Sequence, residues 1–323
     1  MLKKTVSLIL CICLLSTMML TLCSCKNKKG DEYPVTVAGV TIEEEPLNIV
    51  VLSDSLADII SYIGYDVKMV GRSVECDQEF LSVVPLVGTA TAPNIDTIIS
   101  SETDLVIAED NVPDSVKQQF ADNGITLLTL KKPTNFDEMK VLYSDLGTAL
   151  GGKTTGKEKG DTAYTELFDT LDTYNNAIPT SLVKSACYLY LDETGALCTL
   201  TKGTREFDMF AYNGAINVFE SQETPQVDLE QLKFATPTCI FYDSEEVLTY
   251  LRNNADLYDM AALTNEETFL LKKSDFNRMG TTFEENTYRM IEFMFIEEST
   301  PDEATPDDAL AETVSETIVG FVE

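Results

Sequence analysis

Polar and charged side chains follow several apolar, strand-like runs of this sequence, and their types suit the binding of a ligand. Ser53 follows LNIVVL, Glu109 follows DLVIA, and Lys131 follows ITLLTL, while Arg72 ends the run VKMVGR. Ligands of parallel α/β sheets bind outside the carboxyl ends of the strands. We therefore expect these four side chains to line one wall of a ligand site.

Two further residues are predicted at the same site. Cys76 follows Arg72 in GRSVECDQEF, and Arg278 lies in LLKKSDFNRM of the second half of the chain, on the opposite wall. Two alternatives stay open, because Arg72 is also suited to a surface ion pair and free cysteine is usually a buried packing residue. The predicted ligand-binding residues are Ser53, Arg72, Cys76, Glu109, Lys131 and Arg278.

The residue types that are absent limit the chemistry of the site. The chain has no histidine, which is the commonest catalytic base and the commonest metal ligand. It has no CxxC pair, no GxSxG motif and no phosphate-binding glycine loop. The sequence therefore predicts no metal centre, no cofactor and no catalytic residue, although carboxylates can still perform acid–base chemistry.

Strand-like runs alternate with helix-like segments along the chain. LNIVVL precedes SDSLADIISYIG, in which Ser53 or Asp54 is the predicted N-cap and Gly64 the terminator. After position 180 the alternation begins again with ACYLYL, and later PTCIFYD precedes SEEVLTYLRNN. Continuous apolar strands separated by helices predict mostly parallel sheets that are covered on both faces. The predicted fold class is α/β, with two Rossmann-like lobes on either side of a cleft.

A single long helix is predicted to join the two lobes. Between positions 156 and 179, apolar residues recur at helical spacing and form one stripe: Tyr164, Leu167, Phe168, Leu171, Tyr174 and Ile178. The segment from Lys26 to Glu45 is polar and then acidic, which predicts a flexible tether. The predicted divisions of the chain are a signal peptide (1–24), a flexible tether (25–46), the first lobe (47–150), the connecting helix (151–180), the second lobe (181–296) and an acidic C-terminal segment (297–323).

The first residues of the chain resemble the signal peptide of a bacterial lipoprotein. Lysines precede an apolar run from Val6 to Leu22, as in a secretory signal peptide. The sequence LCSC at its end resembles the lipobox, in which a small residue precedes the cysteine that becomes acylated, and Cys25 after Ser24 is the matching position. A retained membrane-spanning helix is the alternative. Both interpretations place the folded chain outside the cytoplasm, and the first attaches it to the cell membrane through lipid chains on Cys25.

The charge of the chain excludes one class of partner. The sequence has 54 acidic and 23 basic residues, a formal net charge of −31. Nucleic acid is therefore not a predicted partner, because binding it requires a basic surface that neutralises phosphates. We interpret most of the acidic excess as a means of solubility, with a specific acidic function as the alternative.

Two cysteines flank the segment YLYLDETGAL. Its turn-forming centre predicts a hairpin that sets Cys187 and Cys198 opposite each other. A disulfide between them and two free thiols are both compatible with the sequence.

The sequence resembles the helix-backbone substrate-binding proteins of ABC importers, the family that captures cobalamin, haem and ferric siderophores. Its most specific stretch, NIDTIISSETDLVIA, is similar to the family's turn, helix and strand in that order. GRSVECDQEF is most similar to the cobalamin branch, with Gln78 and Glu79 where that branch has an aromatic residue and a proline. LCTLTKGTREFDMFAYNGAINVF, VDLEQLKFATPTCIFYD and LLKKSDFNRM match in order, so the resemblance covers roughly positions 47 to 295.

The resemblance implies a function and its partners. A member of this family captures a corrinoid, haem or ferric siderophore between its lobes and delivers it to an ABC permease and its ATPase. Family members dock on the permease through one carboxylate on each lobe, and the matching positions here are Asp96 and Glu230, each in the first turn of a predicted helix. An enzyme or a ligand sensor on the same two-lobed scaffold is the alternative.

The acidic C-terminal segment also carries helix signals. Thr305 is a suitable N-cap, Pro306 suits the first helical position, and apolar residues recur from Leu310 to Phe321. We predict a short helix docked on the second lobe, with a free tail as the alternative.

Overall fold

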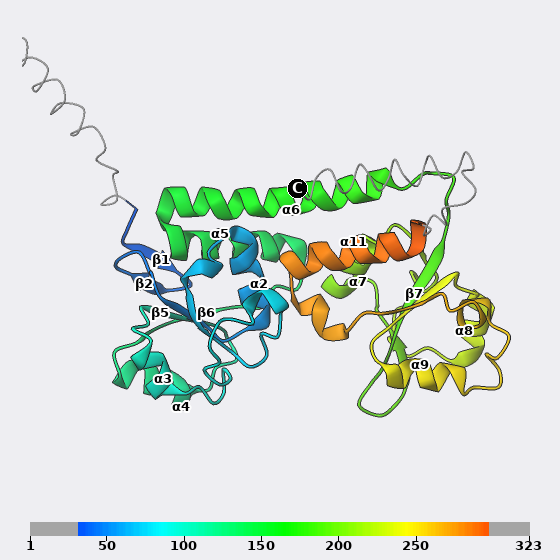
Figure 1. Cartoon of the computed structure of the whole chain (residues 1–323), viewed down its shortest axis with the longest axis horizontal. Helices are drawn as coiled ribbons and strands as arrows, with labels where there is room; N and C mark the ends of the chain where they lie inside the picture. Colours follow the sequence, from blue (N-terminus) through cyan, green and yellow to red (C-terminus); the bar gives the residue numbers. More distant parts are fainter. Residues whose placement is uncertain (1–31, 297–323) are drawn as a thin grey trace, which may run out of the picture.

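The computed structural model describes residues 32–296, which form two α/β lobes side by side (Figure 1). The first lobe contains the strands β1 (Val35–Val37), β2 (Val40–Ile42), β3 (Ile49–Val51), β4 (Met69–Arg72), β5 (Leu105–Glu109) and β6 (Thr126–Leu130), and the helices α2 (Asp54–Ile63), α3 (Ile95–Ser100) and α4 (Asp114–Asp122). Its main sheet has the order β4-β3-β5-β6, and every pair is parallel. All carboxyl ends of this sheet therefore lie at one edge.

The second lobe repeats this plan with one antiparallel strand. Its strands are β7 (Ser185–Leu191), β8 (Leu197–Thr199), β9 (Ile216–Asn217), β10 (Cys239–Tyr242) and β11 (Thr268–Leu270), and its helices are α7 (Arg205–Ala211), α8 (Leu229–Ala235), α9 (Glu245–Arg252), α10 (Ala261–Thr264) and α11 (Thr281–Phe295). The sheet has the order β11-β10-β7-β8, in which only β8 is antiparallel, and β9 also pairs with β7. The prediction of two lobes with mostly parallel sheets is confirmed.

Helices α5 (Phe136–Gly151) and α6 (Lys157–Ala177) form the helical backbone, joined by a π-helical turn at Gly152–Gly156. In Figure 1, α6 runs along the top of the molecule from the first lobe to the second. The two helices pack with their backbones in close approach. A Cβ atom on Gly160 would lie 2.2 Å from the carbonyl oxygen of Tyr143, and one on Gly147 would lie 2.2 Å from that of Gly156. Glycine is therefore required where these helices cross.

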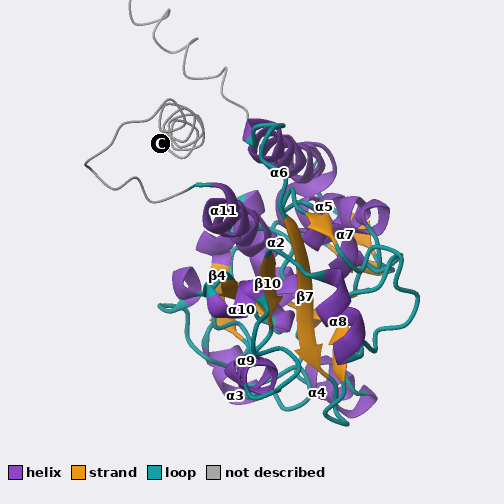
Figure 2. Cartoon of the chain, turned by 90° about the vertical axis from the view of Figure 1, so that its right-hand side faces the viewer, coloured by secondary structure: helices purple, strands orange, loops and turns teal. Residues whose placement is uncertain are grey.

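Alternate residues of the strands enter different hydrophobic clusters, as the period of a strand requires. In β3, Ile49 and Val51 belong to a cluster that continues through α5, α6 and α11 into the second lobe, whereas Val50 packs on the opposite face of the sheet. The outer face of the second sheet has a third cluster, around Leu189 and Ile240. Figure 2 shows α6 and α11 at the top of the second lobe, with β7 and β10 below them. One continuous core thus joins the inner faces of both lobes.

The predicted tether is wrong over residues 32–46, because this segment is folded. Strands β1 and β2 form an antiparallel hairpin whose Val35, Val37 and Ile42 are buried in the core of the first lobe. Ala38 and Gly39 at its turn both have positive φ, at 47° and 81°, which is the geometry that matches the twist of a two-residue hairpin. The acidic composition of the segment had suggested flexibility, but its alternating valines supply a buried face.

The hairpin between β7 and β8 is confirmed, but the predicted position of its two cysteines is wrong. Cys198 pairs with Tyr190, and because the pairing places Thr199 opposite Leu189, Cys187 lies on the other face of the hairpin. Both thiols are free and buried. The structure therefore contains the second alternative, two free thiols.

Three predictions lie outside the described residues: the signal peptide, the acylated Cys25 and the C-terminal helix. Between residues 32 and 296, no helix is both long enough and apolar enough to cross a membrane.

Candidate functional site

Arg278 reaches from the second lobe toward the first and contacts carboxylates of both lobes. It follows the 3-10 turn Lys273–Asn277, and its guanidinium contacts Asp54 at 3.4 Å, Asp275 at 3.4 Å and Asp77. Burial alone would raise the pKa of Asp77, but the hydrogen bond and the charge of Arg278 outweigh it and lower that pKa. Arg278 lies between the lobes as predicted, and its charge is already paired within the chain.

A hollow of about 630 Å³ opens beside this ion-pair cluster. Residues 77–80 of the first lobe line one side, and side chains of the second lobe line the other, among them Leu270, Arg278 and Glu285. We call this space the interlobe hollow. Gln78 and Glu79 at its wall are the two positions at which the sequence departs from the pattern of the cobalamin branch.

Ser53 and Glu109 are brought together at the carboxyl edge of the first sheet. Ser53 is the N-cap of α2, and its hydroxyl donates to Oε1 of Glu109, the last residue of β5, over 3.0 Å. Burial raises the pKa of Glu109, and the hydrogen bond from Ser53 partly opposes this effect. The buried Ser53 and the half-buried Glu109 thus lie together, because the parallel strands β3 and β5 end at the same edge of the sheet.

Arg72 and Cys76 also lie together, but Arg72 contacts the backbone carbonyl group of Cys76 and not its thiol. The guanidinium of Arg72 donates from Nε to the carbonyl oxygen of Val84 over 3.0 Å and also donates to the carbonyl oxygen of Cys76. The Cys76 side chain is fully buried, and burial raises the pKa of its thiol to about 12. Arg72 thus stabilises the loop 73–84 by bonding to two of its carbonyl groups, and the Cys76 side chain packs in the core of the first lobe.

Lys131 faces solvent beside Glu138, 3.7 Å away. Its neighbour Lys132 makes the interlobe contact instead, because its ammonium donates to Oδ1 of Asn277 over 2.6 Å. Arg205 of α7, which is only 2% exposed, donates to the carbonyl oxygen of Pro133 over 2.7 Å. Both contacts join the segment after β6 to the second lobe.

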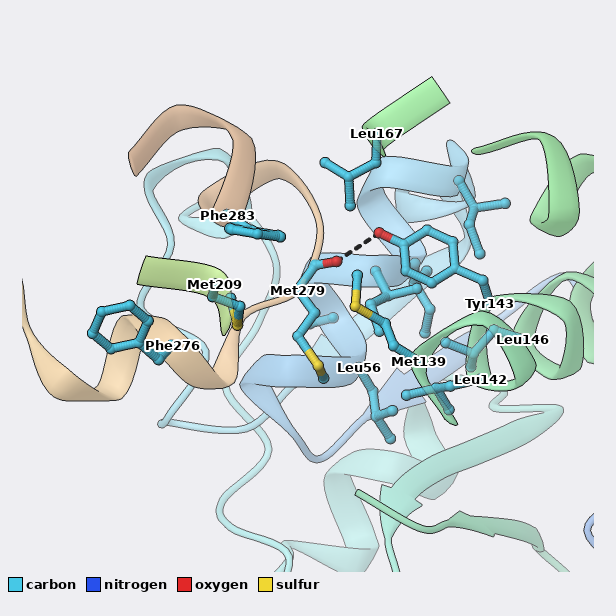
Figure 3. Close-up of a cluster of buried hydrophobic side chains, with 14 of the residues drawn as sticks. Leu56, Met139, Leu142, Tyr143, Leu146, Leu167, Met209, Phe276, Met279 and Phe283 are labelled. Atoms are coloured by element: carbon cyan, nitrogen blue, oxygen red, sulfur yellow. Dashed lines mark hydrogen bonds between the residues drawn. The ribbon is translucent and has the colours of Figure 1, made fainter. Parts of the chain in front are cut away.

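A further interlobe contact is buried, where α2 meets the start of α11. The carboxylate of Asp58, which is fully buried, accepts hydrogen bonds from the backbone N–H of Gly280 at 2.7 Å and of Thr282 at 3.1 Å, and from the Thr282 hydroxyl at 2.7 Å. Burial raises the pKa of Asp58 to about 6, although these donors oppose it. Figure 3 shows the neighbouring Tyr143 hydroxyl, which donates to the carbonyl oxygen of Met279 over 2.6 Å inside the shared core. We call these five residues the spine junction.

Sequence reasoning missed Asp54, Asp58 and Asp77. Asp54 and Asp77 directly follow the predicted residues Ser53 and Cys76, so their positions in the sequence carried a signal. Asp58 carries no such signal, because it lies in the middle of α2 and its partners are 222 and 224 positions away. Residues 32–296 contain no group of three or more His, Cys, Asp or Glu side chains that could hold a metal ion.

Two α/β lobes with mostly parallel sheets, a helical backbone and a hollow lined from both lobes are the features of a two-lobed binding protein. A comparison of the sequence with protein-family models supports this class of protein. A family model described as periplasmic binding protein matches residues 49–274. The chain belongs to this family.

A curated relative shares part of the sequence. An uncharacterized ABC transporter substrate-binding lipoprotein, YvrC of Bacillus subtilis (strain 168), is 31% identical over 137 residues. The match covers 39% of this chain and 43% of the relative, so it spans less than half of that protein.

Solved structures match over a longer range. A possible iron-binding (periplasmic solute-binding) protein from Staphylococcus epidermidis ATCC 12228 has a TM-score of 0.62 at 17% identity, covering 77% of this chain and 99% of its own. The heme-binding protein HutB of Vibrio cholerae has a TM-score of 0.62 at 15% identity, covering 76% and 97%. The vitamin B12 binding protein BtuF of Vibrio cholerae has a TM-score of 0.52 at 20% identity, covering 77% and 96%. These similarities show the two-lobed fold.

Proposed function

We propose that this protein captures a corrinoid, haem or ferric-siderophore ligand between its lobes and delivers it to an ABC permease. The observation that carries the proposal is the interlobe hollow, which is lined from both lobes and lies beside the predicted residue Arg278. Its volume is within the range of small-molecule sites. The solved structures with the same fold include proteins named for haem and for vitamin B12.

Isothermal titration calorimetry tests the capture of a ligand. Purified protein is titrated with cyanocobalamin, haemin and ferrioxamine B in turn. We expect saturable binding of one ligand at a ratio of one to one, weakened in Arg278→Ala because its guanidinium forms part of the hollow. An exposed arginine that does not line the hollow, Arg252 at the end of α9, supplies the control Arg252→Ala. Absence of saturable binding to all three ligands would contradict the proposed function.

We propose that Asp96 and Glu230 are the docking carboxylates toward the permease. Both are exposed, and both lie in the first turn of a short helix, α3 in the first lobe and α8 in the second. Asp96→Lys with Glu230→Lys should leave the affinity for the ligand nearly unchanged and abolish uptake, because both permease contacts would become repulsive. Transport at the wild-type rate by the double variant would contradict this docking.

We propose that acylation of Cys25 anchors the protein outside the cytoplasm. Metabolic labelling with an alkyne fatty acid should label the wild type and Cys23→Ala, and leave Cys25→Ala unlabelled. Equal labelling of the wild type and Cys25→Ala would contradict the assignment.

A further inference from the structure

Three exposed apolar side chains gather where β7 begins. Leu182 and Val183 precede the strand and are 45% and 68% exposed, and Ile216 of β9 is 57% exposed. The backbone N–H of Ile216 donates to the carbonyl oxygen of Lys184 over 2.9 Å, so β9 holds Ile216 beside the residues that lead into β7. We call these three side chains the β7 apolar patch. Apolar side chains that gather on a surface commonly mark a contact with another segment or protein.

The patch and the interlobe hollow lie at opposite edges of the second sheet. Strands β7, β10 and β11 are parallel, and Leu270, the last residue of β11, lines the hollow at the carboxyl edge. The residues that precede β7 lie at the amino edge. An occupant of the patch therefore does not compete with a ligand in the hollow.

The chain leaves the described part of the structure beside this patch. The rings of Phe168 in α6 and Phe283 in α11 lie 6.5 Å apart. Further along both helices, the rings of Tyr174 and Tyr288 lie 5.7 Å apart, so the two helices run side by side in the same direction. Both end near the start of β7 (Figure 1). Because Leu182 follows the end of α6 by five residues, the segment after α11 begins close to the patch.

The sequence beyond α11 has the length and the pattern to cover the patch. Leu310, Val314 and Ile318 recur at helical spacing, and Glu312 falls on the opposite side of such a helix. Leu310 comes 14 residues after residue 296, and an extended chain of that length spans about 45 Å. The apolar stripe can therefore reach the patch.

Charge favours this segment over a second copy of the chain. The segment contains acidic residues but no lysine or arginine. Lys184 adjoins the patch and forms no salt bridge with any residue between 32 and 296. Two copies, each with a net charge of −31, repel one another, whereas a segment of the same chain meets the patch at high effective concentration.

We propose that residues 306–321 form a helix that docks on the β7 apolar patch of the same molecule. Leu310, Val314 and Ile318 contact the patch, and Glu312 faces solvent. The docked segment covers apolar surface at the amino edge of the second sheet and leaves the interlobe hollow open. This contact does not depend on the proposed capture function.

Photo-crosslinking in the full chain tests the docking. The photoreactive residue p-benzoylphenylalanine is introduced at position 314 or, as the matched control on the opposite helix face, at position 312. After illumination, single molecules are separated from crosslinked pairs and digested, and the joined peptides are identified by mass spectrometry. We expect position 314 to crosslink to peptides that contain residues 182–184 or 216, with a yield at least about tenfold higher than from position 312, because one face of the helix meets the patch.

Substitutions in the patch complete the test. Val183→Asp with Ile216→Asp should lower the crosslinking yield from position 314 about tenfold, because apolar side chains would meet unpaired charges. The control, Val67→Asp with Val141→Asp, places the same charges at exposed apolar positions elsewhere and should retain the yield. If the patch variant does not fold, Val183→Ser alone is compared. Equal yields from positions 312 and 314, crosslinks from 314 to other peptides, crosslinks that join two molecules, or a yield that the folded patch variant leaves unchanged would overturn the inference.

Discussion

The spine junction and the interlobe hollow differ in chemistry. At the spine junction, the buried carboxylate of Asp58 accepts hydrogen bonds from Gly280 and Thr282. The Tyr143 hydroxyl donates to the carbonyl oxygen of Met279 inside the shared core. At the interlobe hollow, Gln78 has an unpaired acceptor, and Glu79 and Glu285 have no ion-pair partner among residues 32–296. A contact in which every polar group is paired stabilises one arrangement of the lobes. Unpaired polar groups instead favour the binding of a ligand that supplies their partners.

This difference assigns separate roles to the spine junction and the interlobe hollow. The spine junction lies with α5, α6 and α11 in one core, so it fixes how the lobes are placed. The hollow lies on the exposed side, where side chains can adjust. We therefore expect ligand binding to change the hollow and leave the spine junction as it is.

Removal of Asp58 should give the largest effect. Asp58→Ala leaves the N–H groups of Gly280 and Thr282 and the Thr282 hydroxyl buried without an acceptor, and we expect a loss of about 3–5 kcal/mol in the free energy of unfolding. Asp77→Ala removes a carboxylate whose side chain is 62% exposed, and should cost about 1 kcal/mol or less. Urea unfolding of both variants measures the difference. A larger loss for Asp77→Ala would reverse the comparison.

The pH dependence of stability should identify the buried carboxylate. The folded pKa of Asp58 is about 6, above the value of about 3.9 expected in the unfolded chain. Folded protein therefore binds this proton more readily, and falling pH from about 7 to about 4 should stabilise the wild type relative to Asp58→Asn by up to about 3 kcal/mol. Unfolding of both proteins across this range provides the measurement. A constant difference would show that Asp58 does not titrate there.

The close packing of the helical backbone supplies a test of intermediate size. Gly160→Ala places a Cβ atom 2.2 Å from the Tyr143 carbonyl oxygen, so α5 and α6 must separate. We expect a loss of about 1–3 kcal/mol by overpacking. Thr162→Ala on the exposed face of α6 is the control and should change stability little. Equal stability of the two variants would show that α5 and α6 tolerate separation.

The smallest expected change concerns the overall shape. Bending α6 would break its backbone hydrogen bonds, and the spine junction adds a second restraint between the lobes. Small-angle scattering should therefore show little change in the radius of gyration when ligand is added. A large compaction would mean that the spine junction opens and closes.

The sheets and the connecting helix could be predicted because their signals are local. Continuous apolar runs such as DLVIA indicate strands buried on both faces, and Leu105 and Ile107 face one cluster while Val106 faces another. The hairpin at residues 35–42 was missed although VTVAGVTI alternates, because its acidic surroundings outweighed that pattern.

The interlobe contacts could not be predicted because they depend on the placement of distant segments. Ser53 and Glu109 could be placed at one edge of the first sheet because each lies at the end of a strand-like run. Nothing in the sequence around Asp58 indicates the start of α11 as its partner. The same limit applies to Arg72, whose carbonyl partners depend on how the following loop folds.

Hydrogen–deuterium exchange with and without bound ligand tests the account most directly, using the ligand that calorimetry selects. The amides of Gly280 and Thr282 should exchange slowly in the free protein and change little on binding, because Asp58 already accepts from them. Residues 78–80 should gain protection when the ligand binds. Ligand-dependent protection at Gly280 and Thr282, with no change at residues 78–80, would contradict the division between a fixed spine junction and a ligand-binding hollow.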